Sequence, residues 1–323
     1  MINVGVIGSG SIVTVFLASI AKLKKQYHLC GIWGRHEDKL KMFEEYFDYY
    51  TTDLDKLLND PKIDLVYVAL PNGLHYEYAM KVLKAGKNVF VEKPFTVRYS
   101  ETKKLIDYAN KHDLLCLEAI ISRFNPNFAK AKKQVKKIGK IRMIDGNFSQ
   151  YSRRYDNFRK GIIQPVFDKN LAGGALLDLN VYNIHFVAGL FGMPKDVKYF
   201  PNMQKGVDTS GVLVLDYGSF KATLIAAKDC KTQAHIIVEG EDGCMRSDFT
   251  ASSIDVLKTT IYKGKEFVDE TKFEEFEGFV AELKALARIM KTRDKAEIDA
   301  YNKDTLMVAK IMDKALVSAN INY

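Results

Sequence analysis

The most constraining feature of this sequence is the alternation of apolar strands and amphipathic helices over its first 120 residues. Helix-like patterns separate short, almost entirely apolar runs that cover Ile2–Ile7, His28–Trp33, Asp64–Leu70, Asn88–Glu92 and Leu114–Ala119. A strand that lacks polar alternation is buried on both faces, as in a parallel sheet with helices on both sides. The sequence therefore predicts a doubly wound α/β domain at the N-terminus.

The pattern changes after residue 122. Helices and strands no longer alternate. We expect helices at Pro126–Lys137, Leu176–Phe191, Phe276–Thr292 and Lys303–Ala319. Strands are expected at Ile141–Ser152 and, several of them, between Val197 and Arg246. A run of strands with segregated helices is typical of an α+β domain. We expect residues 1–121 to bind a dinucleotide, and residues 122–323 to bind substrate and mediate oligomerisation.

Composition argues against several classes of protein. The formal net charge is +8, but the lysines are dispersed and no RNA-binding or recognition-helix signature accompanies them, so no nucleic-acid partner is predicted. The N-terminus lacks a basic signal-peptide region, and no apolar run approaches the roughly twenty residues of a spanning helix. The four cysteines are scattered without a C-x-x-C pair, which favours reduced thiols, no metal framework and a cytoplasmic location.

The first chemical motif is "GVIGSGSIV", residues 5–13, where a strand meets a helix. Gly8 permits a tight turn, and Gly10 lets the backbone approach a pyrophosphate. The N–H groups of the following helix, beginning at Ser11 and Ile12, would bind that anion. The third small position of such fingerprints is Val13 here, which is a departure. A dinucleotide site is predicted.

The tip of the second strand indicates which dinucleotide binds. NAD sites place a carboxylate there for the ribose 2′-hydroxyl, whereas NADP sites place a cation for the 2′-phosphate. The tip reads Gly34-Arg35-His36, and the first acids are Glu37 and Asp38 in the next helix. Arg35 is able to stack on adenine and pair with a phosphate. NADP is therefore favoured over NAD, although a solvated loop arginine is the competing interpretation.

Two further motifs follow central strands. In "ALPNGLHYEYAM", residues 69–80, Pro71 and Asn72 lie where a doubly wound sheet opens its ligand crevice, and His75 lies in the first turn of the next helix. In "VFVEKPFTV", residues 89–97, a buried strand ends in Glu92-Lys93-Pro94. Taken alone, this second motif is more typical of a polar surface turn than of a site.

The second domain contributes "GGALLDLNVYNIH", residues 173–185. The glycines allow a flexible or closely approached backbone before a helix. Asp178, Tyr182 and His185 stand at i, i+4 and i+7, so one helix face carries a carboxylate, a phenol and an imidazole. A tyrosine at such a boundary is often a core residue, but three co-facial polar groups beside a glycine pair favour a site.

In this order, the motifs resemble the family of glucose–fructose oxidoreductase, inositol dehydrogenase and MocA over nearly the whole chain. "EAIISRFNP" (118–126) and "GGALLDLNVY" resemble most the branch of dimeric dihydrodiol dehydrogenase and xylose-type aldose dehydrogenases. The resemblance implies a Rossmann domain followed by an open-faced mixed, mainly antiparallel sheet. It also implies that Lys93 meets Tyr182 and Asp178 across the domain interface. Asn180 departs from the glycine usual in the family.

The implied activity is hydride transfer between NADP, or NAD, and a secondary alcohol or carbonyl of a sugar, polyol or dihydrodiol. Tyr182 would exchange the proton, Lys93 would favour its phenolate, and Asp178 would orient Lys93 or bind a substrate hydroxyl. Inositol dehydrogenases usually have histidine where this chain has Tyr182. The family also includes regulators that bind NADP without turnover, which is the alternative function.

The predicted site residues form three groups. Those for catalysis are Lys93, Tyr182 and Asp178; for cofactor binding Gly8, Gly10, Ser11, Ile12, Arg35, Pro71, Asn72, His75, Glu92 and Lys93; and for substrate binding Lys93, Arg123, Asp178, Tyr182 and His185. Arg153, Arg154 and Tyr155 suit either a substrate mouth or the surface. Because Val212–Leu215 is apolar in both alternating sets and helices cover one sheet face, we expect a homodimer or a dimer-based oligomer.

Overall fold

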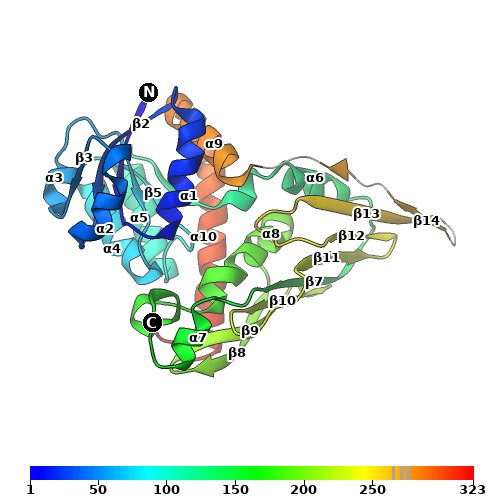
Figure 1. The fold of residues 1–323 in the computed structure, drawn as a ribbon. Helices are drawn as coiled ribbons and strands as arrows, with labels where there is room; N and C mark the ends of the chain where they lie inside the picture. The colour runs from blue at the N-terminus through cyan, green and yellow to red at the C-terminus, as the bar shows by residue number, and fades with distance from the viewer. Residues whose placement is uncertain (264–265, 270–271, 274–276) are drawn as a thin grey trace. The chain divides into compact units, whose positions relative to one another are not determined.

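The computed structural model describes residues 1–263, 266–269, 272–273 and 277–323, and the chain divides into two compact units (Figure 1). Unit 1 comprises Met1–Ala119 and Phe279–Leu306, and unit 2 comprises Ile120–Gly278 and Met307–Tyr323. The chain first passes from unit 1 to unit 2 between Ala119 and Ile120, close to the predicted domain boundary at residue 121. In contrast to the expected continuous second domain, residues 279–306 pack with unit 1. Their amphipathic pattern predicts a helix but does not specify its packing partner.

Unit 1 is built on a parallel sheet. Its spatial order is β3 (Tyr49–Thr51), β2 (Tyr27–Trp33), β1 (Ile2–Ile7), β4 (Leu65–Val68), β5 (Asn88–Glu92) and β6 (Cys116–Ala119). Every neighbouring pair is parallel. The central strands β4 and β5 are buried at every position, as their continuous apolar runs predict. The predicted doubly wound α/β fold is confirmed.

The helices of unit 1 follow the predicted alternation with two differences. They are α1 (Ser11–Ile20), η1 (Ala21–Leu23), α2 (Glu37–Leu40), η2 (Lys41–Tyr46), α3 (Leu54–Leu58), η3 (Asn72–Leu74), α4 (His75–Lys84), α5 (Tyr99–Lys111), α9 (Gly278–Thr292) and the first part of α10 (Lys295–Ser318). The predicted helix over 37–47 is a short α-helix continued by a 3-10 helix. β3 and α3 were not predicted, because segments of three and five residues carry little periodicity.

Unit 2 contains the predicted mixed sheet. Its order is β14 (Glu266–Asp269), β13 (Val256–Lys263), β12 (Gly243–Ser247), β11 (His235–Gly240), β7 (Ile141–Ser149), β10 (Lys221–Ala227), β9 (Val207–Asp216) and β8 (Asp196–Gln204), and β15 (Lys272–Phe273) pairs with β13. The β7–β10 pair is parallel and the other pairs are antiparallel. The mainly antiparallel character is therefore confirmed. The strands after Arg246 were not predicted.

The remaining elements of unit 2 are helical. They are η4 (Ile121–Phe124), α6 (Pro126–Gln134), α7 (Tyr155–Arg159), η5 (Pro165–Phe167), η6 (Lys169–Leu171), the π-helical turn η7 (Leu176–Asn180), α8 (Val181–Phe191) and the end of α10. The predicted start of a helix at Phe276 lies outside the described residues. The last helix, α10, begins at Lys295 rather than at the predicted Lys303.

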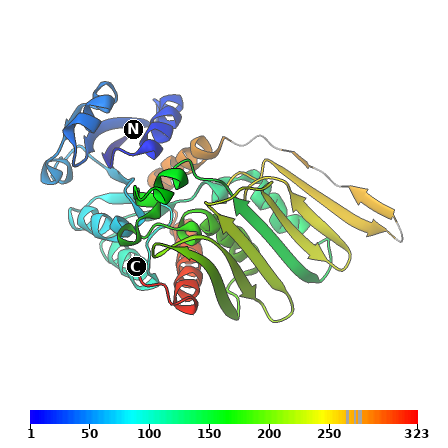
Figure 2. The same cartoon turned by 60° about the horizontal axis from the view of Figure 1, so that its bottom comes forward.

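The two faces of the unit 2 sheet differ in burial. Leu213, Leu215 and Leu224 are fully buried on the face against which α8 packs. The alternate residues of the same strands, Val212 and Ile225, are only half-buried and pair across the strands. Figure 2 shows this sheet with its strands toward the viewer and helices behind it. The sheet face that carries Val212 and Ile225 therefore has no helix of unit 2 packed on it among the described residues.

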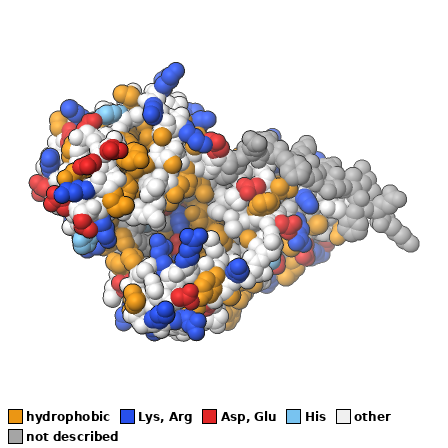
Figure 3. Space-filling model, viewed as in Figure 1, with side chains coloured by type: hydrophobic (Ala, Val, Ile, Leu, Met, Phe, Trp, Pro, Cys, Tyr) orange, Lys and Arg blue, Asp and Glu red, His pale blue; other side chains and the backbone are white. Residues whose placement is uncertain are grey.

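The distribution of charges on the surface and the length of the helices agree with what the composition predicts. On the face drawn in Figure 3, lysine and arginine side chains are dispersed among aspartates and glutamates over both units. Within the described residues, no helix is long and apolar enough to cross a membrane.

Three glutamates lie buried in unit 1. Glu92, Glu118 and Glu282 are 7%, 1% and 1% exposed. Glu92 accepts hydrogen bonds from the Tyr67 hydroxyl and the Lys93 N–H, and Glu118 accepts them from the Phe95 N–H at 3.1 Å and the Thr305 hydroxyl at 3.0 Å. Burial, followed by the charges of Glu92 and Glu118, raises the pKa of Glu282 well above its ordinary value. Ionising Glu282 in the folded protein is therefore costly.

We expect Glu282→Gln to change how stability depends on pH. A carboxyl whose pKa is raised by folding stabilises the native state at low pH, and this contribution is lost as pH rises through the folded-state pKa. The wild type should therefore lose free energy of unfolding with rising pH, by at most about 1.4 kcal/mol per pH unit from this group, and the variant should lose less. Urea titrations between pH 5 and 9 measure this, with the exposed Glu77→Gln as control. Parallel curves for wild type and Glu282→Gln would contradict the prediction.

Candidate cofactor and substrate site

The turn between β1 and α1 requires glycine at Gly8. This residue has φ +122°, and a Cβ there would overlap the carbonyl oxygen of Ala69. Its N–H donates to the Trp33 carbonyl at 2.9 Å, which ties the turn to the end of β2. Because the turn is held between two neighbouring strands, it has a fixed position at the carboxyl edge of the sheet.

Gly10, in contrast to Gly8, has open space where a side chain would lie. It precedes α1 in an extended conformation, and a Cβ there would meet no protein atom within 4 Å. No acidic side chain occupies the first turn of α1, and Ser11 is exposed. Unsatisfied N–H groups facing open space at a helix N-terminus suit an anion such as a dinucleotide pyrophosphate. Val13 is fully buried, so the larger third residue is accommodated in the core.

Arg35 lies two residues beyond β2 and is exposed. Gly34 between them is buried, and a Cβ on it would lie 3.4 Å from the Ser9 hydroxyl of the glycine turn. The strand tip that carries Arg35 is thus adjacent to the predicted pyrophosphate turn. Glu37 and Asp38 begin α2, as predicted, and leave no acid at the strand tip itself.

His75 differs from its predicted role in cofactor binding. It is fully buried, and its Nδ1 and Nε2 lie 2.8 Å from the Pro94 carbonyl oxygen and 2.7 Å from the Leu70 carbonyl oxygen. Burial lowers the pKa of this imidazole. Direct contact with a ligand is therefore excluded in this conformation. The half-buried Pro71 and Asn72 remain accessible beside it.

The Glu92-Lys93-Pro94 segment is held in place by hydrogen bonds to buried side chains. His75 contacts the Pro94 carbonyl, Glu118 accepts the Phe95 N–H, and the Glu92 carboxylate is engaged by Tyr67. The Lys93–Pro94 peptide is cis, and Lys93 is half-buried. Glu92 is therefore bonded within the loop, its contact with the cofactor stays a prediction, and Lys93 is the more accessible charged residue. Glu118 was missed because a carboxylate in "CLEA" resembles a strand-end surface residue.

In unit 2, Asp178 lies in the π-helical turn before α8 and forms an ion pair with Lys228. The Lys228 side chain is 3% exposed and its Nζ lies 5.5 Å from the centre of the Phe167 ring. Lys228 was not among the predicted site residues. The signal that pointed to Lys93, a charge directly after an apolar strand, is also present in "LIAAKDC", residues 224–230.

The start of this turn is anchored by Asp208. This buried carboxylate accepts hydrogen bonds from the Leu176 N–H at 2.7 Å and from the hydroxyls of Tyr199 and Tyr323 at 2.7 and 2.9 Å. A Cβ at Gly174 would overlap the Asp208 carboxylate, so the predicted close backbone approach occurs at this glycine. Burial raises the pKa of Asp208.

The predicted helix-face trio has three different environments. Asp178 lines a cavity of about 460 Å³, Tyr182 is half-buried against Phe148 with ring centroids 5.8 Å apart, and His185 is 8% exposed. The π-helical turn shifts the register between Asp178 and the later residues, which a regular helical spacing does not anticipate. Asn180 is fully buried and donates to the Leu224 carbonyl at 3.1 Å. The residue that departs from the family pattern is therefore hydrogen-bonded to β10.

The other residues predicted to bind substrate also differ in their environments. Arg153 and Arg154 line the cavity beside Asp178. Tyr155 is buried, and its hydroxyl donates to Gln204 at 3.0 Å, which makes it a core residue. Arg123 lies half-buried in η4 and does not line this cavity.

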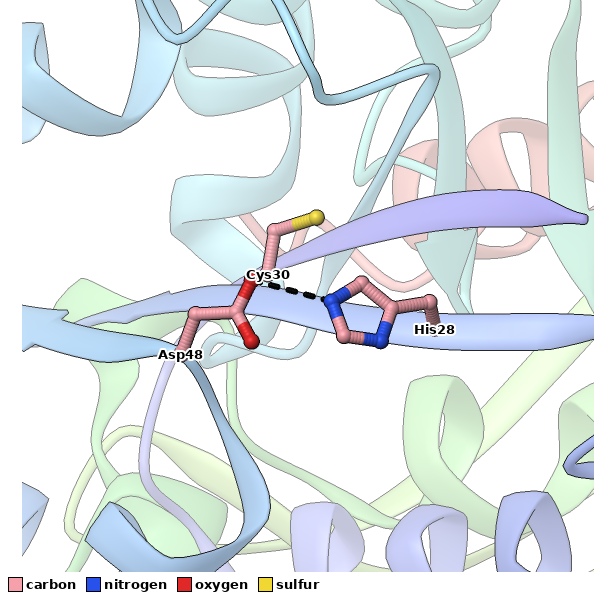
Figure 4. A group of neighbouring side chains, drawn as sticks. All are labelled: His28, Cys30 and Asp48. Atoms are coloured by element: carbon pink, nitrogen blue, oxygen red, sulfur yellow. Dashed lines mark hydrogen bonds and ion pairs between the residues drawn. The ribbon is translucent and has the colours of Figure 1, made fainter.

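Among the described residues, one group has the composition of a metal site. Figure 4 shows His28, Cys30 and Asp48 side by side, with potential ligand atoms within 4.8 Å of one another. His28 Nε2 and Asp48 Oδ2 are 2.9 Å apart and partly exposed. Burial and nearby carboxylates, Asp48 first, raise the pKa of the Cys30 thiol to about 11. In this conformation His28 and Asp48 are hydrogen-bonded to each other beside the buried Cys30 thiol.

Comparisons with known proteins agree with this geometry. Residues 2–119 match "Oxidoreductase family, NAD-binding Rossmann fold", and residues 128–246 match "GFO/IDH/MocA C-terminal domain". A scyllo-inositol 2-dehydrogenase (NADP(+)) of Bacillus subtilis (strain 168) is 35% identical over 77% of this chain and 76% of its own. A trans-1,2-dihydrobenzene-1,2-diol dehydrogenase of Xenopus tropicalis is 27% identical over 99% and 98%. The crystal structure of a 3-ketoreductase from Actinomadura kijaniata with NADP and TDP-benzene superposes with TM-score 0.84 at 23% identity, covering 98% and 97%.

Gly10→Ala provides a direct test of the glycine turn. Because the added methyl meets no protein atom, the melting temperature should stay within about one degree of wild type, as small surface changes usually allow. The methyl would occupy the space that a pyrophosphate needs, so affinity for NADP(H) should fall at least about tenfold. Fluorescence titration with NADPH measures this. Unchanged affinity would contradict the assignment, and Gly8→Ala, which must distort the turn, should in contrast lower the melting temperature.

Proposed function

The chain belongs to the GFO/IDH/MocA family of oxidoreductases, and from this premise we propose that it is an NADP-dependent dehydrogenase or reductase. The reaction is hydride transfer at a CH–OH or carbonyl carbon of a sugar, polyol or dihydrodiol. The observation that carries the proposal is the glycine turn, where Gly8 is sterically required and Gly10 opens onto the N-terminus of α1. Arg35, next to that turn, supports NADP.

When bound, the nicotinamide would supply hydride transfer, and the protein would supply proton transfer and orientation. Tyr182 takes the proton from the substrate hydroxyl during oxidation and returns it during reduction. Lys93, presented by the braced loop after β5, favours the phenolate through its positive charge. Asp178 binds a substrate hydroxyl while Lys228 holds its carboxylate in place.

The experiment that tests the proposal is a dehydrogenase screen. Reduced nicotinamide is followed by its absorbance with NADP and NAD against inositols, aldoses, keto-sugars and an aromatic dihydrodiol. Turnover with one member supports the enzyme. Binding of NADPH without turnover of any member would instead indicate a cofactor-binding regulator.

We further propose a cytoplasmic homodimer formed through the open sheet face of unit 2. Phe200 on β8 is 62% exposed and pairs with Val212 of β9, which pairs with Ile225 of β10. This row of apolar residues crosses three strands on the face that no helix of unit 2 covers. A second copy of the chain is the simplest cover for such a face, since C₂ dimers are the commonest assemblies.

Sedimentation velocity at micromolar concentration checks the assembly. The wild type should sediment as a dimer or a larger dimer-based species. Phe200→Asp places a charge in the proposed interface and should produce monomers, whereas Met42→Asp, at an exposed methionine of unit 1, should not. A monomeric wild type would contradict the proposed dimer.

Arg35→Ala tests the choice of cofactor. The wild type should bind NADP(H) more tightly than NAD(H), because a guanidinium pairs with the 2′-phosphate. The variant should lose about ten- to a hundredfold in NADP(H) affinity, the usual range for a charge-assisted pair, and little in NAD(H) affinity. Titration of both cofactors into both proteins measures the preference. A wild type that prefers NAD would refute the assignment.

Tyr182→Phe and Lys93→Met test the proton-transfer pair. Loss of a general acid–base group lowers turnover on the order of 10²–10⁴-fold. Tyr182→Phe should show this loss with NADPH affinity nearly intact, because the ring still packs and the glycine turn is unchanged. Lys93→Met should do similar damage and shift the alkaline limb of the pH–rate profile. The two losses should be strongly non-additive, because each residue works through the other.

A matched control is available in unit 2. The Tyr217 hydroxyl donates to the Gly192 carbonyl at 2.9 Å, away from the cavity. Tyr217→Phe should lose some stability and keep its turnover. If Tyr182→Phe behaves in the same way, Tyr182 is a core residue, and the proton-transfer role passes to His185 or Asp178.

A further inference from the structure

We propose that the substrate carries an anionic group, a carboxylate or a phosphate on a sugar or polyol, and that Arg153 and Arg154 bind it. This inference rests on the proposed dehydrogenase function and specifies its substrate class. The cavity of about 460 Å³ in unit 2 is lined by residues 150–154 on one side and by Val166, Asp178, Leu179 and Lys228 on the other. Its size lies within the range of small-molecule sites, roughly 300–1,000 Å³.

The charges of this cavity are unbalanced. Its lining contains three cations, Arg153, Arg154 and Lys228, and one carboxylate, Asp178. Asp178 and Lys228 neutralise each other in a mostly buried ion pair. Within the described part of the chain, neither guanidinium has an ion pair or a hydrogen bond. The nearby Asp156 is engaged by the Tyr151 hydroxyl at 2.7 Å. The cavity therefore keeps two positive charges without counter-charge.

The segment that carries the two arginines is fixed to the sheet. The Gln150 N–H donates to the Ala227 carbonyl and the Ser152 N–H donates to the Lys228 carbonyl, both at 2.9 Å. These bonds extend the β7–β10 pairing past the ends of both strands. On the other side, Tyr155 is buried and its ring stacks near Phe158, with centroids 6.2 Å apart. Arg153 and Arg154 are exposed at their tips, but their backbone is held between two anchors, so little order must be gained on binding.

Two neighbouring guanidiniums select for oxyanions. Arginine presents planar donors that match carboxylate and phosphate groups in bidentate geometry. A neutral polyol would leave both guanidiniums of the lining without an anionic partner. A concave site with net positive charge also concentrates anions. The geometry thus points to a substrate whose hydroxyl meets Asp178 and whose anionic group meets the arginines.

Matched neutral and anionic compounds test this on the full-length protein with NADP. Suitable sets are glucose with glucose 6-phosphate and glucuronate, and myo-inositol with an inositol monophosphate. We expect at least one anionic member to exceed its neutral parent about tenfold in kcat/KM, with a KM that rises with ionic strength. The paired phosphate and carboxylate arms decide which oxyanion is preferred.

The variant pair R153A/R154A should raise the KM of the anionic compound about ten- to a hundredfold and leave its kcat largely unchanged, since charge-assisted hydrogen bonds of binding are lost. R153K/R154K keeps the charge without the planar fork and should fall between. Arg142→Ala is the matched control, because Arg142 pairs with Glu241 on the exposed part of unit 2 and does not line the cavity. Titration calorimetry of the NADPH-loaded protein gives a second readout that needs no turnover.

The outcomes separate the two proposals. Neutral parents that are used as well as their anionic derivatives overturn the anionic substrate and leave the dehydrogenase intact. Anion binding that R153A/R154A abolishes, without turnover of any compound, supports the anion site and overturns the dehydrogenase. An equal loss in Arg142→Ala shows general electrostatic attraction and overturns the role of the two arginines. Absence of both binding and turnover overturns both proposals.

Discussion

Parallel pairing of the strands in unit 1 brings the carboxyl end of every strand to one edge of the sheet. The glycine turn after β1, Arg35 after β2, Asn72 after β4 and Lys93 after β5 therefore lie along the same edge, although they are far apart in sequence. This edge is held by backbone and buried polar contacts rather than by surface charges. The Gly8 N–H is tied to β2, and His75 and Glu118 brace the loop after β5.

Unit 2 uses buried charge in a different way. Lys228 is nearly inaccessible and fixes Asp178 at the cavity, while Asp208 anchors the beginning of the turn that carries Asp178. A buried ion pair contributes little net stability, because desolvation offsets the attraction, but removing one partner is costly. The pair is therefore better understood as a device that fixes the orientation of a carboxylate. It leaves the two arginines of the same cavity to determine what else binds there.

The sequence anticipated much of the candidate site, and its failures have a common origin. Gly8, Gly10 and Arg35 lie where the strand–turn–helix pattern places them, and Lys93 is accessible. His75 and Glu92 were predicted to bind the cofactor but are buried and bonded to the protein itself. A polar residue near a strand end has the same local signature whether it faces a ligand or braces a loop. Burial distinguishes the two, and burial depends on residues distant in sequence.

By itself, the sequence determined the alternation of the longer strands and helices in unit 1, the parallel character of the first sheet and the glycine turn, because these follow from residue periodicity and local steric requirements. Only the tertiary structure decided that residues 279–306 pack with unit 1, that Glu282 is buried near Glu92 and Glu118, and that Asp178 pairs with Lys228 fifty residues away. Each of these depends on which surfaces come together. A local pattern states that a helix face is apolar or that a lysine follows a strand, but the partner is chosen by long-range packing.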